Sequence, residues 1–318
     1  MDQTLTRWIL PLIQVVLLVL LGPLVTGLIQ KMKARLQCRR GAGILQPYRD
    51  LLKLLRKGTV QSDTSGSFFR VVPVLVLGAT CAAATLVPVF FAPVTAGHAA
   101  LLPLGDALLL AGWFALARFL TAIAALDAGG AFGGMGASRE MTVATLVEPA
   151  LILVIFSVAI VAGTTDLRVI AGHPVGMRGS FGAADLLALF AMLILLLAET
   201  GRIPVDNPDT HLELTMLHEG MLLEHSGPGF GCLVLAHHIK QIVLIAFVQA
   251  LFFPWKAANT NPQALVMGLG AFILGTLALS VFLAIVESTY AKLRFFNLPQ
   301  FLSISLLSSF LAVALRLL

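Results

Sequence analysis

Apolar runs long enough to cross a bilayer recur along the whole chain. Trp8–Ile29 and Leu101–Leu126 are two of them, and a spanning helix needs about 20 mostly apolar residues. Of the 318 residues, 58% are hydrophobic and only 12% are charged, whereas a soluble domain carries about 25% charged residues. Because so few charges cannot cover a water-facing surface, the sequence predicts an integral membrane protein rather than one large soluble core.

The lipid environment limits which secondary structure the chain can adopt. In hydrocarbon only helices and closed barrels satisfy all backbone hydrogen bonds, and the apolar runs lack the alternation of barrel strands. The first run has no small-residue cleavage site, so we interpret it as a membrane helix rather than a signal peptide. We predict an all-α integral membrane protein, one polytopic domain over residues 1–318. Its eight predicted transmembrane helices lie at about 8–30, 71–92, 104–126, 143–163, 183–201, 235–254, 264–286 and 300–318.

The Lys and Arg residues predict the orientation. The formal net charge is +5, and the segment between the first two predicted helices holds ten of the 21 basic residues. Cytoplasmic loops of membrane proteins are enriched in Lys and Arg, which explains this charge better than nucleic-acid binding does. We therefore expect a multi-pass protein of the cell (inner) membrane, with both termini outside, large loops in the cytoplasm and no nucleic-acid partner.

Residues 44–57 are too few to span and show helical spacing of apolar side chains. Pro47 suits a first helical turn. The pattern predicts an amphipathic helix at the membrane surface. It is compatible with a simple anchor and with the wall of a cavity under a docked subunit. The apolar positions are Ile44, Tyr48, Leu51, Leu52 and Leu55.

Ionisable residues interrupt five of the predicted spans, all in the cytoplasmic half. Charges inside a membrane are costly and therefore point to function. We expect Arg118 to pair with Glu148 or another of these acids, because an unpaired buried charge costs more. Such pairs either hold helices together or form a hydrated chain that carries protons. The charged residues are Arg118, Glu148, Glu199, Lys240 and Glu287, with His237 and His238 in the same layer.

An acidic loop at about residues 199–231 follows the fifth predicted helix. Clustered carboxylates raise each other's pKa, which suits proton exchange, although a solvated loop would look similar. Three histidines recur every seven residues, about 10 Å apart along a helix, too far for one metal ion to bridge neighbours. The ionisable residues are Glu199, Asp206, Asp209, Glu213, Glu219 and Glu224, with His211, His218 and His225 between them.

Cysteine usage gives no sign of a metal cluster. Cys38, Cys81 and Cys232 form no CxxC pair, and their spacing fits neither a zinc nor an iron–sulfur site. We expect this chain to carry no cofactor of its own.

Four long motifs resemble a known family. They are ARLQCRRGAGILQPYRDLLKLLRK at 34–57, ALDAGGAFGGMGASREMTVATLVEP at 125–149, ETGRIPVDNPDTHLELTMLHEGMLLEHSG at 199–227 and ESTYAKLRF at 287–295. The chain resembles the subunit 1 family of NADH:quinone oxidoreductase (complex I). In particular, it is similar to the membrane subunit of formate hydrogenlyase and hydrogenase-4-type [NiFe] hydrogenase complexes.

The resemblance implies partners and cofactors. A subunit of this kind anchors a peripheral arm of iron–sulfur and hydrogenase-type large and small subunits. That arm carries iron–sulfur clusters and, in hydrogenases, a nickel–iron site. It also contacts antiporter-like membrane subunits and the lipid bilayer. In complex I it forms much of the quinone tunnel. By motif position, the resemblance predicts an arm-docking or quinone-cavity surface made of Arg39, Arg40, Gln46, Asp50, Arg202, Lys292 and Arg294.

The same motifs, combined with the intramembrane charges, predict a coupling or proton relay. Its members are Arg118, Glu148, Glu199, Asp206, Asp209, Glu213, Glu219, Glu224, Lys240 and Glu287. The sequence departs from the family pattern in several places: RRGAG at 39–43 for RRGPG, PVD at 204–206 for PFD, and EHSG at 224–227 for EYSG. Asp209 and His211 each replace an expected Glu. These changes weaken the case for a standard quinone site and leave most of the carboxylates.

Three functions are compatible with these features. The leading one is a membrane coupling subunit without a catalytic centre, in which charge changes pass along Glu224, Glu213, Glu199, Glu148 and Arg118. The second is a quinone-binding subunit with a cavity between the amphipathic helix and the first span. The third is a free-standing ion transporter, which the absence of an internal repeat and the large cytoplasmic loops disfavour.

Overall fold

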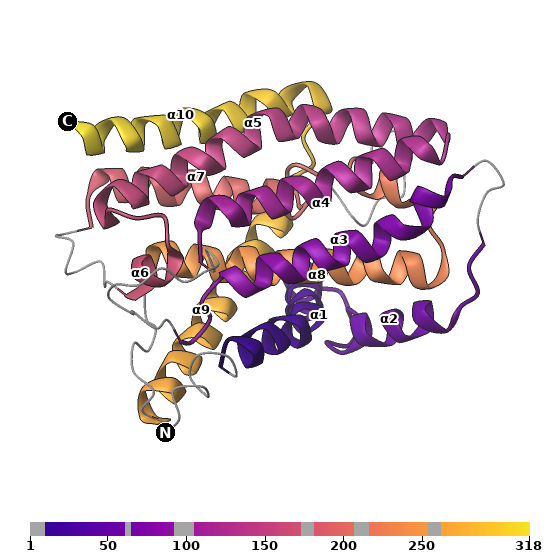
Figure 1. Cartoon of the computed structure of the whole chain (residues 1–318), viewed down its shortest axis with the longest axis horizontal. Helices are drawn as coiled ribbons and strands as arrows, with labels where there is room; N and C mark the ends of the chain where they lie inside the picture. Colours follow the sequence, from indigo (N-terminus) through magenta and orange to yellow (C-terminus); the bar gives the residue numbers. More distant parts are fainter. Residues whose placement is uncertain (1–9, 61–64, 92–104, 173–180, 207–215, 254–261) are drawn as a thin grey trace.

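The structure, a computed structural model, describes residues 10–60, 65–91, 105–172, 181–206, 216–253 and 262–318. The regular secondary structure of these residues is helical (Figure 1), apart from one isolated bridge between Asp106 and Asp166, and turns and irregular segments connect the helices. The elements are α1 (Leu10–Leu36), α2 (Gln46–Arg56), α3 (Ser67–Leu86), α4 (Ala107–Asp127), α5 (Ala131–Ala162), α6 (Leu167–Gly172), α7 (Ala183–Glu199), η3 (Glu219–Leu222), α8 (Gly227–Phe252), α9 (Pro262–Thr289), η4 (Phe295–Asn297) and α10 (Leu298–Leu317).

Seven of the described helices are long and apolar enough to cross a membrane: α1, α3, α4, α5, α8, α9 and α10. The prediction of an all-α, multi-pass membrane protein is confirmed at this level. The helix α7 coincides with the fifth predicted span but has only 17 residues.

Two helices begin earlier than predicted. We expected spans from 143 and 235, whereas α5 begins at Ala131 and α8 at Gly227. The first turns of α5 are rich in glycine and those of α8 in glycine and proline, residues typical of loops. In the fold these small residues allow close packing: a Cβ on Gly136 would lie only 3.0 Å from the carbonyl oxygen of Leu217. Tertiary contact here overrides the weak local helix propensity.

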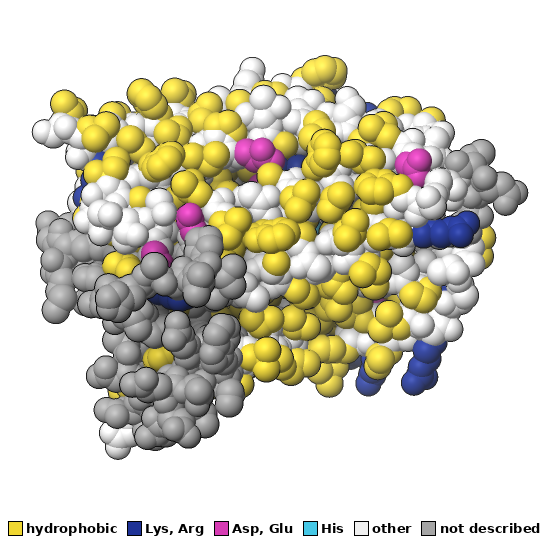
Figure 2. All heavy atoms as spheres, viewed as in Figure 1, with side chains coloured by type: hydrophobic (Ala, Val, Ile, Leu, Met, Phe, Trp, Pro, Cys, Tyr) yellow, Lys and Arg dark blue, Asp and Glu magenta, His cyan; other side chains and the backbone are white. Residues whose placement is uncertain are grey.

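The helix α8 forms the centre of the bundle. In Figure 1 it runs alongside α3, with α4, α5 and α10 on one side and α1 and α2 on the other. Residues Ile242–Ala246 of α8 are fully buried. By contrast, α9 leaves the bundle at a steep angle, and its Met267 and Leu274 are exposed. The face seen in Figure 2 carries many hydrophobic side chains and few charged ones across its middle, as expected of a lipid-facing surface.

The predicted amphipathic helix is present as α2. Pro47 lies in its first turn, and Pro47 and Leu51 are buried. A Cβ on Gly231 would lie 3.3 Å from the Cβ of Leu54, so α2 packs closely on the start of α8. Leu52 and Leu55 remain exposed. Only part of the apolar face of α2 is covered by this chain.

The end of α3 depends on one buried side chain. The Oε1 atom of Gln14 on α1 accepts hydrogen bonds from the backbone N–H groups of Val89, Phe90 and Phe91, at 2.7, 3.1 and 3.3 Å. We expect Gln14→Leu to lower the free energy of unfolding by about 1–3 kcal/mol, because it leaves buried donors unsatisfied. Thermal unfolding in detergent measures this. Gln263→Leu, at an exposed position, should have little effect on the free energy of unfolding. Equal losses of stability at both positions would contradict the role assigned to Gln14.

Candidate functional site

Five charged side chains from four helices meet inside the bundle. Arg118 on α4 donates from Nη1 to Oε1 of Glu148 at 2.6 Å and from Nη2 to Glu199. Its Nε atom lies 3.3 Å from Oε1 of Glu140. Lys240 on α8 lies 2.6 Å from the second carboxylate oxygen of Glu199. We call these five residues the Arg118 cluster. The predicted pairing of Arg118 with Glu148 or another of the acids is confirmed.

Burial makes these pairs energetically important. The side chain of Arg118 is 5% exposed and that of Glu199 is 2% exposed, whereas Glu148 is 41% exposed. Removing a charge from water costs several kcal/mol, which only close oppositely charged partners offset. Arg118 provides this compensation for three carboxylates at once, and Glu148 carries the cluster to the surface of the bundle.

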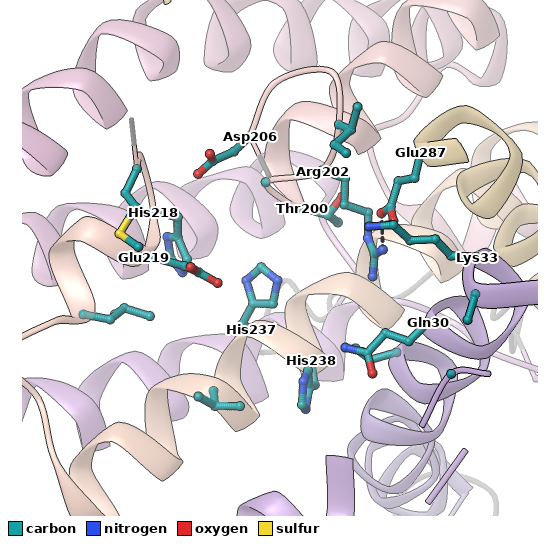
Figure 3. A pocket seen from close by; sticks show the side chains of 18 of the residues that line it. Gln30, Lys33, Thr200, Arg202, Asp206, His218, Glu219, His237, His238 and Glu287 are labelled. Carbon is teal, nitrogen blue, oxygen red and sulfur yellow. Dashed lines mark hydrogen bonds and ion pairs between the residues drawn. The ribbon is translucent and has the colours of Figure 1, made fainter. Parts of the chain in front are cut away.

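A second group surrounds Glu287 near the end of α9. Its carboxylate lies 3.3 Å from Nζ of Lys33 on α1 and also accepts from Arg202. Arg202 donates to Oε1 of Gln241 at 3.0 Å, and Thr26 donates to the same oxygen at 3.0 Å. Figure 3 shows Arg202 and Lys33 converging on Glu287.

One short segment connects these groups. Glu199 belongs to the Arg118 cluster, Arg202 to the Glu287 group, and Asp206 pairs with Lys292 at 2.8 Å. Asp206 also accepts a hydrogen bond from the backbone N–H of Leu217 at 3.1 Å. We call residues 199–206 the connector. A shift of the connector changes three ion-pair groups together.

A cavity of about 1080 Å³ lies beside the connector. It is bounded by α1, the connector, η3 and α8 (Figure 3). This differs from the cavity expected between α2 and α1: Gln46 and Asp50 on α2 hydrogen-bond each other at 2.9 Å and are absent from its wall. Its ionisable lining residues are Lys33, Arg39, Arg40, Arg202, Asp206, His218, Glu219, His225, His237, His238 and Glu287.

Glu224 and Arg294 lie apart from the cluster, and two members of the cluster lie elsewhere in their helices than predicted. Glu224 is exposed and lies against Gly130, at the N-terminus of α5, where a negative charge favours the helix dipole. Arg294 is exposed beside η4. Lys240 and Glu148 lie near the middle of α8 and α5, not near their starts as expected, because both helices begin earlier. Asp209 and Glu213 lie outside the described residues.

Two members of the network were missed at the sequence level. Glu140 was assigned to a loop, but α5 includes it, and Glu140 and Glu148 then share one helix side at a spacing of eight residues. That spacing was the available signal. Lys33 was counted only as a loop cation; nothing local distinguishes it from Lys31, and its contact with Glu287 depends on how α1 meets α9.

His225 makes a ring stack that depends on pH. Its imidazole lies on Phe69 with ring centroids 4.0 Å apart, and burial lowers the pKa of His225 to about 4 from 6.5. The folded state therefore binds this proton less readily than the unfolded state, so stability is lost as the pH falls from about 6.5 to 4. We expect the melting temperature in detergent to fall less between pH 7.5 and 4.5 for His225→Phe than for the wild type. An equal fall in both would contradict this.

Within the described ranges no three His, Cys, Asp or Glu side chains are placed to hold a metal ion.

Comparisons with known proteins agree with the fold and the motifs. A family model described as NADH dehydrogenase matches residues 9–317. Formate hydrogenlyase subunit 4 of Escherichia coli (strain K12) is 36% identical over 295 residues, 91% of this chain and 92% of the relative. Hydrogenase-4 component C of the same organism is 36% identical over 288 residues, 90% of this chain and 89% of the relative.

More distant similarities follow. NADH-ubiquinone oxidoreductase chain 1 of Paracentrotus lividus is 26% identical over 288 residues, 87% of this chain and 85% of the relative. A chain in the structure of the membrane-bound sulfane sulfur reductase (MBS), an archaeal respiratory membrane complex, matches with a TM-score of 0.79 at 21% identity, covering 96% of this chain and 98% of that chain. The motif resemblance is thus confirmed, and the chain belongs to the NADH dehydrogenase subunit 1 family.

Proposed function

We propose that this chain is the membrane anchor and coupling subunit of a complex I-like, energy-converting assembly of the [NiFe] hydrogenase or formate hydrogenlyase type. The observation that carries the proposal is the Arg118 cluster, which the connector joins to the Glu287 group and to the cavity. The similarity to formate hydrogenlyase subunit 4 and hydrogenase-4 component C supports this branch of the family.

Electrostatics supports a coupling role. Two unit charges 4 Å apart interact by about 4 kcal/mol at an effective dielectric constant of 20, so a charge that appears in the cavity acts strongly on Arg202 and Asp206. Because Arg202 and Asp206 both belong to the connector, a displacement of either side chain is transmitted to Glu199. Glu199 in turn contacts Arg118, which contacts Glu148. Redox chemistry in a docked arm would thereby alter the proton affinity of carboxylates inside the membrane.

The proposed arrangement places α7 as an eighth span, both termini outside and the cavity toward the cytoplasm. Peripheral iron–sulfur and hydrogenase-type large and small subunits dock on that side, on the uncovered face of α2 and the basic residues Arg39, Arg40 and Arg294. Antiporter-like membrane subunits contact the spans, with the partially exposed Glu148 facing one of them. The chain itself supplies charge and shape and no cofactor.

A quinone-binding subunit is the alternative, favoured by the size of the cavity. A volume of about 1080 Å³ is at the upper end of the range for small-molecule sites. Hydrogen turnover by the purified complex that requires added quinone, and that fails in Arg39→Gln, would favour this alternative.

Glu148→Gln in the assembled complex tests the coupling role. The amide keeps an oxygen for Arg118 but cannot take up a proton, so we expect ion translocation to fall roughly tenfold or more while hydrogen turnover persists. The assay measures acidification of liposomes that contain the complex. The complex is isolated in mild detergent by purifying this chain together with its partners, and the preparation is checked for a nickel–iron large subunit. Asp127→Asn changes an exposed carboxylate outside the predicted relay and should translocate normally. Normal translocation in Glu148→Gln would defeat the coupling role.

A further inference from the structure

His218 lies where three cavities meet. Besides the large cavity of about 1080 Å³, it lines one of about 30 Å³ with Arg118, Glu140 and Lys240. It also lines one of about 10 Å³ with Glu140 and Glu199. A water molecule needs about 10–15 Å³ of such space, so the cavity of about 30 Å³ has room for two waters at most and the cavity of about 10 Å³ for one at most. His218 thus separates the large cavity from the Arg118 cluster.

A second imidazole, that of His237, lies next to His218. The rings of His218 and His237 have centroids 5.2 Å apart and are tilted by 32°, so the two imidazoles are direct neighbours. Both line the large cavity and the 30 Å³ cavity, and Figure 3 shows the two rings on its wall, from the segment before η3 and from α8.

Its surroundings keep His218 neutral. Burial lowers the pKa of His218, so at neutral pH one ring nitrogen donates and the other accepts, the state that passes protons. The titratable and charged groups that face it are Glu140 of α5, His237 and Lys240 of α8, Asp206 of the connector and Arg118 of α4, with Glu219 next to it in the chain.

The Arg118 cluster holds more carboxylates than cations. It contains three carboxylates, Glu140, Glu148 and Glu199, for two cations. Glu140 makes the longest of the three contacts with Arg118, 3.3 Å, and it lines both small cavities together with His218. Of the three carboxylates, Glu140 is therefore the one that Arg118 holds least closely.

We propose that His218 passes protons between the large cavity and the Arg118 cluster, with Glu140 as the group that exchanges them. A hydronium ion in the cavity protonates the free ring nitrogen, and the opposite nitrogen releases its proton to the Glu140 carboxylate; no electrons move. The imidazole then exchanges tautomers before the next transfer. This inference rests on the proposed coupling function and names the residue through which the cavity communicates with the cluster.

The intact complex in liposomes tests this, with hydrogen evolution from reduced methyl viologen as the driving reaction. Protons moved per hydrogen formed should fall roughly tenfold or more in His218→Gln, His218→Ala and Glu140→Gln, with hydrogen evolution retained. Millimolar imidazole should restore translocation in His218→Ala, because the large cavity admits it to the vacated site. Asp127→Asn, which changes an exposed carboxylate outside all three cavities, should translocate normally with or without imidazole.

Several results would overturn the inference. One is a normal ratio in His218→Gln or in Glu140→Gln. Another is a loss in His218→Ala that imidazole leaves unchanged, because this would indicate a packing role. Glu140→Gln leaves His218 unchanged. The ratio of protons to hydrogen in this variant therefore tests the inference even if the histidine variants do not assemble. If the wild-type complex moves no protons, the coupling function itself fails, whatever His218 does.

Discussion

Arg118→Leu is expected to prevent stable folding and assembly. The change leaves Glu140, Glu148 and Glu199 without the guanidinium that contacts all three. Breaking a buried pair by removing one partner typically costs about 3–5 kcal/mol, a large part of the total stability of a domain. The yield of monodisperse protein and its unfolding temperature in detergent measure the effect.

Controls separate this effect from a general loss of arginine. Arg294→Leu changes an exposed arginine and should leave yield and stability almost unchanged. Arg118→Lys keeps the charge but cannot reach three carboxylates with one ammonium, so we expect an intermediate loss. Combining Arg118→Leu with Glu199→Leu should recover part of the stability, because coupled neighbours are not additive. Additive losses in the double variant would show that Arg118 and Glu199 do not depend on one another.

Glu287→Gln should produce the next largest loss. Lys33 and Arg202 both contact this carboxylate, and the side chains of all three are at most 8% exposed. Without the negative charge, two buried cations repel each other, and we expect the free energy of unfolding to fall by about 3 kcal/mol or more. The measurement is thermal unfolding in detergent, alongside Glu224→Gln as an exposed glutamate.

A second substitution tests the cause of that loss. Lys33→Met removes one of the two cations and retains an apolar stem of similar length. We therefore expect Lys33→Met with Glu287→Gln to be more stable than Glu287→Gln alone. If Lys33→Met worsens the loss, repulsion between Lys33 and Arg202 is not its origin. Because Arg202 belongs to the connector, Glu287→Gln should also reduce ion translocation in assembled complexes.

Much of the fold was predictable because its signals are local. Long apolar runs and few charges require membrane helices, and every predicted span overlaps a described helix. The helical spacing in residues 44–57 predicted α2. The intramembrane residues Arg118, Glu148 and Glu199 stood out because charges are rare in hydrocarbon. The predicted roles of Asp209 and Glu213 stay predictions, since both lie outside the described residues.

The sequence by itself determined the membrane class, the positions of the helices and the charged residues that the bilayer disfavours, because hydropathy is a property of each segment alone. Only the tertiary structure decided which charges meet. It extended α5 to include Glu140, placed Lys33 against Glu287, and put His218 between the cavity and the Arg118 cluster. The physical reason is that partners and burial depend on which helix faces touch, and residues that are 30 or more positions apart carry no local record of that contact.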